Sequence, residues 1–226
     1  RRFAVTTPGS PYFFSSGAFA PVFDGAFLRD SLGYVRIGGV EELCLPAETA
    51  LPGPHNKLNL LAAALSLRLS GLDCRKISSS LSAFPGIEHR MEPVREIDGV
   101  RWYNDSAATI PEATAASLRS FEDPIHLITG GTDKNLDFEV LRSVAGVPRS
   151  IHLLAGSATD KLILLLDSEH IPYRGPFPSL PEAVESAHRS ASPGEIVLLS
   201  PGATSFGMFA NEFDRGRQFK ELVKGL

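Results

Sequence analysis

The chain has 226 residues, of which 43% are hydrophobic and 21% are charged, and its formal net charge is −4. This composition is typical of a soluble globular protein, and the absence of a basic stripe argues against a nucleic-acid-binding surface. The longest apolar runs, such as Leu58–Leu67, are too short or too interrupted to cross a bilayer. We therefore expect neither a nucleic-acid partner nor a membrane partner.

The first 52 residues predict short strands separated by turns. Apolar and aromatic segments alternate there with Gly, Ser and Asp, and no helical spacing occurs. The predicted strands are Phe3–Val5, Tyr12–Phe14, Ala26–Arg29 and Tyr34–Ile37. The sequence begins without methionine, inside the first of these strands, so we expect a fragment of a longer protein.

Helical spacing begins near Pro54. Apolar residues recur every three or four positions until Gly71 ends the pattern, namely Leu58, Leu61, Ala62, Leu65 and Leu69. A second, shorter helix is predicted over Ile77–Phe84, and Pro85-Gly86 ends it. We place a domain boundary here, which gives expected domains over residues 1–87 and 88–226.

The two cysteines, Cys44 and Cys74, lie 30 positions apart and belong to no metal-binding motif. We expect two buried free thiols, with a disulfide as the alternative. Neither residue suggests a metal site.

After the boundary, apolar strands alternate with amphipathic helices. The predicted strands are Gly99–Tyr103, Ile125–Ile128, Ile151–Leu154 and Ile196–Leu199, and the predicted helices are one opened by Thr109–Glu112, then Phe138–Val144, Thr159–Leu166, Ala183–Ala191 and Phe213–Val223. The spacing of Thr109 and Glu112 is that of a capping box. Strands that are apolar on both faces predict an open, mostly parallel α/β sheet that helices cover on both sides.

Ligands of open α/β sheets bind at the carboxyl ends of the strands, which selects three loops. These loops are Asn104–Thr109, Thr129–Asn135 and Ser200–Gly207, and they are rich in Gly, Ser, Thr and Asp. In the second loop, Lys134 follows two glycines, which predicts a site for a carboxylate or phosphate. A tight turn with a solvated lysine explains that loop equally well.

The other two loops have structural alternatives as well. Asp105 could accept a hydrogen bond from a sugar hydroxyl or help to hold a metal, and it could equally cap a helix. The hydroxyls of Ser200–Gly207 are typical of a helix cap, and the loop does not match the nucleophile elbow of a hydrolase.

Three further sets of residues favour a structural interpretation. Gly53–Asn56 favours a helix cap. His89-Arg90, near the expected boundary, favours a surface ion pair, although an arginine there could bind a phosphate. We interpret His126 and His152 as packed histidines within strands. The sequence holds no phosphate-binding loop with the Gly-Lys-Ser/Thr ending, no dinucleotide-binding glycine motif and no zinc-ligand spacing.

The order and spacing of these motifs resemble the Mur ligase family, in particular its D-glutamate-adding branch. The family patterns Gly-x-His-Asn, an interdomain segment ending in His-Arg, Asn-Asp-Ser-Lys-Ala-Thr, Gly-Gly-x-x-Lys and a closing signature with Ser-Phe and Arg-Gly are similar to Gly53–Asn56, Phe84–Arg90, Asn104–Thr109, Gly130–Lys134 and Ser200–Gly216. Five weak motifs in the right order make a specific pattern.

The resemblance implies a Rossmann-like C-terminal Mur ligase domain, preceded by the end of the central ATPase domain. It implies ATP-dependent joining of D-glutamate to UDP-N-acetylmuramoyl-L-alanine in peptidoglycan precursor synthesis, with ATP and Mg²⁺ bound mainly by a part that precedes this chain. It also implies a cytoplasmic monomer. The fragment alone is expected to be inactive.

The resemblance assigns roles to individual residues. On its terms His55, Asn56, Arg90 and Asp105 bind the nucleotide, Arg90 towards phosphate and Asp105 towards the ribose. The D-glutamate pocket then consists of Thr109, Lys134, Ser205 and Phe206, and Lys134 is the residue assigned to catalysis.

Two departures from the family pattern concern this pocket. Ala107 replaces a common lysine, and Gly207 replaces a usual aspartate. Another Mur or folylpolyglutamate-type ligase with a different acceptor amino acid is therefore one alternative. A non-catalytic anion-binding module is another.

Overall fold

The computed structural model describes residues 9–226 and divides the chain into two compact units, which join between Pro85 and Gly86. We expected the boundary after residue 87. The predicted strand Phe3–Val5 lies outside the described residues. No helix in the described part of the chain is long and apolar enough to span a membrane.

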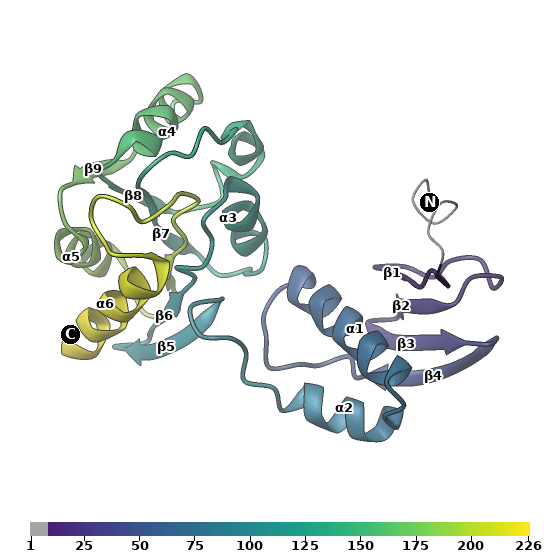
Figure 1. Cartoon of the computed structure of the whole chain (residues 1–226). Helices are drawn as coiled ribbons and strands as arrows, with labels where there is room; N and C mark the ends of the chain where they lie inside the picture. Colours follow the sequence, from purple (N-terminus) through teal and green to yellow (C-terminus); the bar gives the residue numbers. More distant parts are fainter. Residues whose placement is uncertain (1–8) are drawn as a thin grey trace. The chain divides into compact units, whose positions relative to one another are not determined.

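The first unit is a four-stranded sheet packed against two helices (Figure 1). The strands are β1 Phe13–Ser15, β2 Gly25–Arg29, β3 Leu32–Ile37 and β4 Val40–Leu45, and the helices are α1 Pro54–Leu69 and α2 Cys74–Ser82. The strand order is β1-β2-β3-β4, with β1 parallel to β2 and the other pairs antiparallel. Two hairpins place Asp30-Ser31 and Gly38-Gly39 at positive φ, which two-residue hairpin turns require.

The two cysteines are paired, so the expectation of two free thiols is wrong. Cys44 on β4 and Cys74 at the start of α2 are both buried and form a disulfide. Helix α2 packs on β4 and brings their α-carbons to 4.6 Å, within the range of disulfides. This proximity arises from packing between distant segments, which the spacing of the cysteines did not indicate.

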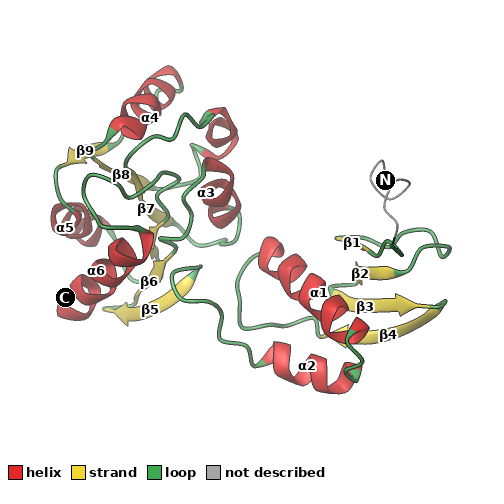
Figure 2. Cartoon of the chain, in the orientation of Figure 1, coloured by secondary structure: helices red, strands yellow, loops and turns green. Residues whose placement is uncertain are grey.

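The second unit is an open six-stranded sheet with helices on both faces (Figure 2). Its strands are β5 Glu92–Ile97, β6 Val100–Asn104, β7 Ile125–Gly130, β8 Ser150–Leu154, β9 Arg174–Phe177 and β10 Ile196–Leu199. Their order is β5-β6-β10-β7-β8-β9, and every pair except β5–β6 is parallel. The predicted α/β architecture is confirmed.

The alternation of side chains along each strand builds two cores. Ile196 and Leu198 of β10 pack against α3 (Pro111–Leu118), the 3₁₀ helix η1 (Glu139–Val144) and α4 (Ser157–Ser168). Val197 and Leu199 pack on the opposite face, against α5 (Leu180–Ser190) and α6 (Glu212–Gly225). The sheet is therefore covered on both sides, as its apolar strands predicted.

The start of α3 differs from the prediction. Ile110 is the N-cap residue, no side chain caps the helix, and Pro111 occupies the first turn. The capping box predicted for Thr109 and Glu112 is therefore wrong, because the chain enters the helix one residue later.

Candidate functional site

The three selected loops emerge at the same edge of the second sheet. Strand β10 lies between β6 and β7, parallel to both, with Leu199 paired to Asn104 and to Ile128. The loops Asn104–Thr109, Thr129–Asn135 and Ser200–Gly207 therefore lie at neighbouring strand ends. This edge is where open α/β sheets bind ligands.

Hydrogen bonds join the loop after β7 to the loop after β10. The backbone N–H groups of Thr132 and Thr204 each donate to the other residue's carbonyl at 3.0 Å. The Thr204 hydroxyl also donates to the Thr132 carbonyl, and the Thr132 hydroxyl donates to the Phe206 carbonyl. The Lys134 ammonium then lies 5.0 Å from the centroid of the Phe206 ring. The structure thus brings Lys134 and Phe206 together.

Close backbone approach explains the two glycines before Lys134. Gly130 and Gly131 have φ angles of 104° and 135°. A Cβ on Gly130 would lie 2.5 Å from the Thr159 hydroxyl, and one on Gly131 would lie 2.6 Å from the Thr204 carbonyl oxygen. A larger residue at position 131 would push the loop after β10 away, and one at position 130 would push α4 away, so this pair of glycines sets the geometry of the edge.

A buried arginine, whose role the sequence did not indicate, connects the first loop to the third. Arg215 is fully buried, and its guanidinium donates to the Ser106 hydroxyl at 3.0 Å, the Ser106 carbonyl at 2.9 Å and the Ala203 carbonyl at 3.2 Å. Burial lowers the pKa of Arg215 to about 10. Its place in the Arg-Gly motif was the only signal in the sequence.

Asp105 is a buried carboxylate in contact with three internal donors. It accepts hydrogen bonds from the Met91 N–H at 3.1 Å, the Ser117 hydroxyl at 2.6 Å and the Ser200 hydroxyl at 2.8 Å. Burial raises its pKa above the usual value of an aspartate. These contacts join β6, α3 and β10, and its contact with a ribose stays a prediction.

Arg90 is exposed, and the residue before it is anchored in the unit. His89 is buried with φ of 65°, and its Nδ1 lies 2.8 Å from the Asn104 side-chain amide. Because that amide donates, Nδ1 is the unprotonated ring nitrogen, and burial lowers the pKa of His89. The His89 carbonyl also accepts from the Ala107 N–H at 2.9 Å, which places the backbone at Arg90 beside the loop Asn104–Thr109.

Thr109 and Ser205 complete the predicted pocket residues of this unit. Ser205 is buried, between the loop-joining Thr204 and the half-exposed Phe206. Thr109 is half-buried, and no hydrogen bond among residues 9–226 joins it to Lys134 or Ser205. The shared pocket for all three residues stays a prediction.

In the first unit, His55 and Asn56 lie in the first turn of α1. Gly53 is the N-cap residue and no side chain caps the helix, so the capping interpretation is wrong. Asn56 is buried, and its amide donates to the Pro52 carbonyl at 2.8 Å. Across residues 9–226, no group of three His, Cys, Asp or Glu side chains could hold a metal ion.

Comparison with known proteins finds curated relatives that are named as ligases. The chain matches curated UDP-N-acetylmuramoylalanine–D-glutamate ligases of Roseiflexus sp., with 47% identity over 83% of this chain and 41% of the relative, and of Symbiobacterium thermophilum, with 37% identity over 100% of this chain and 50% of the relative. The chain thus spans about half the length of these relatives. No family model matches it.

Solved structures share the fold at low identity. UDP-N-acetylmuramate-alanine ligase MurC from Thermotoga maritima aligns with TM-score 0.61 and 18% identity over 86% of this chain and 44% of its own. E. coli FolC in complex with ADP aligns with TM-score 0.62 and 18% identity over 90% of this chain and 47% of its own. The fold is therefore that of the Mur and FolC ligases. Within this class, the relatives show that the chain belongs to the family of UDP-N-acetylmuramoylalanine–D-glutamate ligases.

Proposed function

We propose that this chain supplies the D-glutamate-binding side of an ATP-dependent ligase that joins D-glutamate to UDP-N-acetylmuramoyl-L-alanine. The names of the relatives support this activity. The observation that carries it is the exposed Lys134 ammonium, held beside the Phe206 ring where β7 and β10 end. In this proposal residues 1–87 are the end of the central ATP-binding domain, and residues 88–226 are the C-terminal domain.

The reaction needs an activated carboxylate and a positioned amine. ATP supplies the phosphoryl group that converts the L-alanine carboxylate into an acyl phosphate. The amine of D-glutamate attacks the carbonyl carbon, the tetrahedral intermediate loses inorganic phosphate, and an amide bond remains. Such chemistry depends on positioning and charge neutralisation more than on a covalent nucleophile. Lys134 neutralises a carboxylate of D-glutamate, while Thr109, Ser205 and Phe206 orient the amino acid.

Four residues are proposed to bind the nucleotide. Arg90 has an exposed guanidinium that fits a phosphate, and His55 and Asn56 lie at the N-terminal turn of a long helix. Asp105 fits a ribose hydroxyl less directly, because its oxygens already accept three hydrogen bonds. As the family resemblance implies, we assign Mg²⁺ mainly to the part of the ligase outside this chain. We further propose a cytoplasmic monomer.

Replacement of Lys134 by methionine in the complete ligase tests this function. We expect the KM for D-glutamate to rise about 30-fold, because loss of one charge-assisted contact costs about 2 kcal/mol. Phosphate release with D-glutamate, L-glutamate and diamino acids is the measurement. Lys224→Met is the matched control, since Lys224 forms an exposed ion pair with Glu221 on α6. An unchanged KM in Lys134→Met, or a preference for L-glutamate, contradicts the proposal.

A further inference from the structure

The turn that carries Lys134 is held by α4 as well as by the loop after β10. The Asp133 N–H donates to the Ser157 hydroxyl at 3.0 Å, and the Ala158 N–H donates to the Gly131 carbonyl at 2.9 Å. The Asp133 carboxylate accepts from the Leu136 N–H at 3.0 Å and so closes the turn over Lys134. Backbone on both sides of Lys134 is therefore fixed.

Lys161 of α4 completes this arrangement. Its ammonium lies 2.6 Å from the second carboxylate oxygen of Asp133 and donates to the Leu136 carbonyl at 3.3 Å. The hydrogen bond from Lys161 is the main reason that the pKa of Asp133 is lowered. Asp133 is therefore ionised at neutral pH, and one ammonium connects both ends of the turn to a helix.

The backbone of the turn is left-handed at one position. Asn135, directly after Lys134, has φ of 61°, a conformation that asparagine adopts more readily than most residues other than glycine. An ion pair with a half-exposed lysine contributes little to global stability. Its effect is local, because it fixes the position at which the turn presents the Lys134 side chain.

We propose that Asp133 and Lys161 are positioning residues that hold the Lys134 ammonium in place for the carboxylate of the incoming amino acid. This inference rests on the proposed function, because it assumes that Lys134 binds D-glutamate. Asp133 and Lys161 act through the turn, and Lys134 alone touches the ligand. If the turn loses this support and becomes disordered, binding of the amino acid must order it again. That cost raises the KM for the amino acid and leaves the chemical step unaffected.

The test uses Asp133→Asn, Lys161→Met and Lys161→Arg in the complete ligase, with Lys134→Met and Lys224→Met beside them. We expect Asp133→Asn and Lys161→Met each to raise the KM for D-glutamate about fivefold, with kcat and the KM for ATP changed less than about twofold. Lys161→Arg keeps the ion pair and should restore most of the affinity. The double variant Asp133→Asn/Lys161→Met should have a KM for D-glutamate no higher than that of Lys161→Met alone, because both changes remove the same ion pair.

Thermal unfolding of the same variants separates positioning from folding. The midpoints should stay within about 3 °C of wild type, as expected for a half-exposed ion pair. Three results overturn the proposal: a KM for D-glutamate that Asp133→Asn and Lys161→Met leave unchanged, equal losses for all substrates, or failure of Lys161→Arg to rescue. If Lys134→Met raises this KM while the other two variants do not, only the positioning roles are wrong. If wild type does not use D-glutamate, the proposed function is wrong as well.

Discussion

Among single residues, His126 of β7 and His152 of β8 belong to a row of buried, hydrogen-bonded polar side chains. This row lies away from the edge of the sheet where the three loops emerge. His126 Nε2 lies 2.8 Å from the Glu195 carboxylate, and its Nδ1 lies 2.7 Å from the Ser150 hydroxyl. The same hydroxyl lies 2.8 Å from His152 Nε2, whose Nδ1 lies 3.0 Å from the Ser186 hydroxyl. Both histidines are packed inside the unit, as predicted.

These buried histidines should make the stability of the second unit depend on pH. Burial lowers the pKa of His152 to about 4, below the unfolded value of about 6.5. Between these values the unfolded state binds more protons, so stability is complete above pH 6.5 and is lost as pH falls towards 4. We expect a loss of about 3 kcal/mol between pH 7 and pH 4, measured by urea unfolding. The pKa of Glu195 is also lowered, so its contribution to stability is likewise lost as the pH falls, at pH values below the usual pKa of a glutamate.

Two His→Asn variants isolate the contribution of His152. His152→Asn should flatten the dependence between pH 6.5 and pH 4, because the titrating ring is gone. His170→Asn is the control: His170 is exposed, and asparagine tolerates its φ of 55°. A pH dependence that survives in His152→Asn would assign the effect to other groups.

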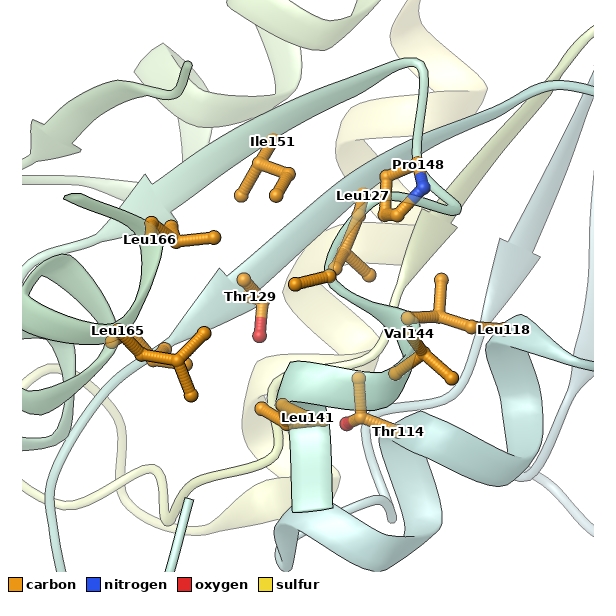
Figure 3. A pocket seen from close by; sticks show the side chains of 12 residues that line it. Thr114, Leu118, Leu127, Thr129, Leu141, Val144, Pro148, Ile151, Leu165 and Leu166 are labelled. Carbon is orange, nitrogen blue, oxygen red and sulfur yellow. The ribbon is translucent and has the colours of Figure 1, made fainter. Parts of the chain in front are cut away.

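At the scale of elements, the helix predicted over Phe138–Val144 is the 3₁₀ helix η1. Three residues per turn place Leu141 and Val144 on one side, and both line an apolar cavity of about 30 Å³ against β7, β8 and α4 (Figure 3). Leu141→Ala should therefore lower the free energy of unfolding by about 3 kcal/mol, because it enlarges an existing cavity. Leu164→Ala on α4, which is 72% exposed, should cost less than about 0.5 kcal/mol. Equal losses in urea unfolding would contradict this.

The elements that the sequence predicted are those with long apolar runs or regular helical spacing. Strands β7, β8 and β10 are apolar on both faces and were found within one or two residues. Strands β4, β5 and β9 were missed because they form sheet edges, where polar residues and Gly-Pro are tolerated.

The same distinction holds for the candidate site. Its loops followed from strand ends, which local sequence predicts. The contacts that shape them did not, because Arg215 reaches Ser106 from 109 positions away and Lys161 reaches Asp133 from α4. Such contacts arise from tertiary packing, and no local pattern encodes them.

At the scale of the whole molecule, the hydrophobic cores of the two units have no residue in common. One core, built from β2, β3, β4, α1 and α2, uses buried residues between positions 26 and 81. The other two lie on opposite faces of the second sheet and use buried residues between positions 91 and 223. Each unit therefore has what a cooperative folding transition requires.

We expect two separate transitions when the chain unfolds, and two core variants can assign them. Leu61 of α1 and Leu153 of β8 are both fully buried, one in each unit. Leu61→Ala should destabilise only residues 9–85, and Leu153→Ala only residues 86–226, each by about 3 kcal/mol. The unfolding midpoint should then fall by roughly 20 °C in the smaller first unit and by roughly 10 °C in the second. Differential scanning calorimetry measures both. A single transition that both variants lower equally would mean that the two units unfold as one, because a variant in one core cannot otherwise destabilise the other.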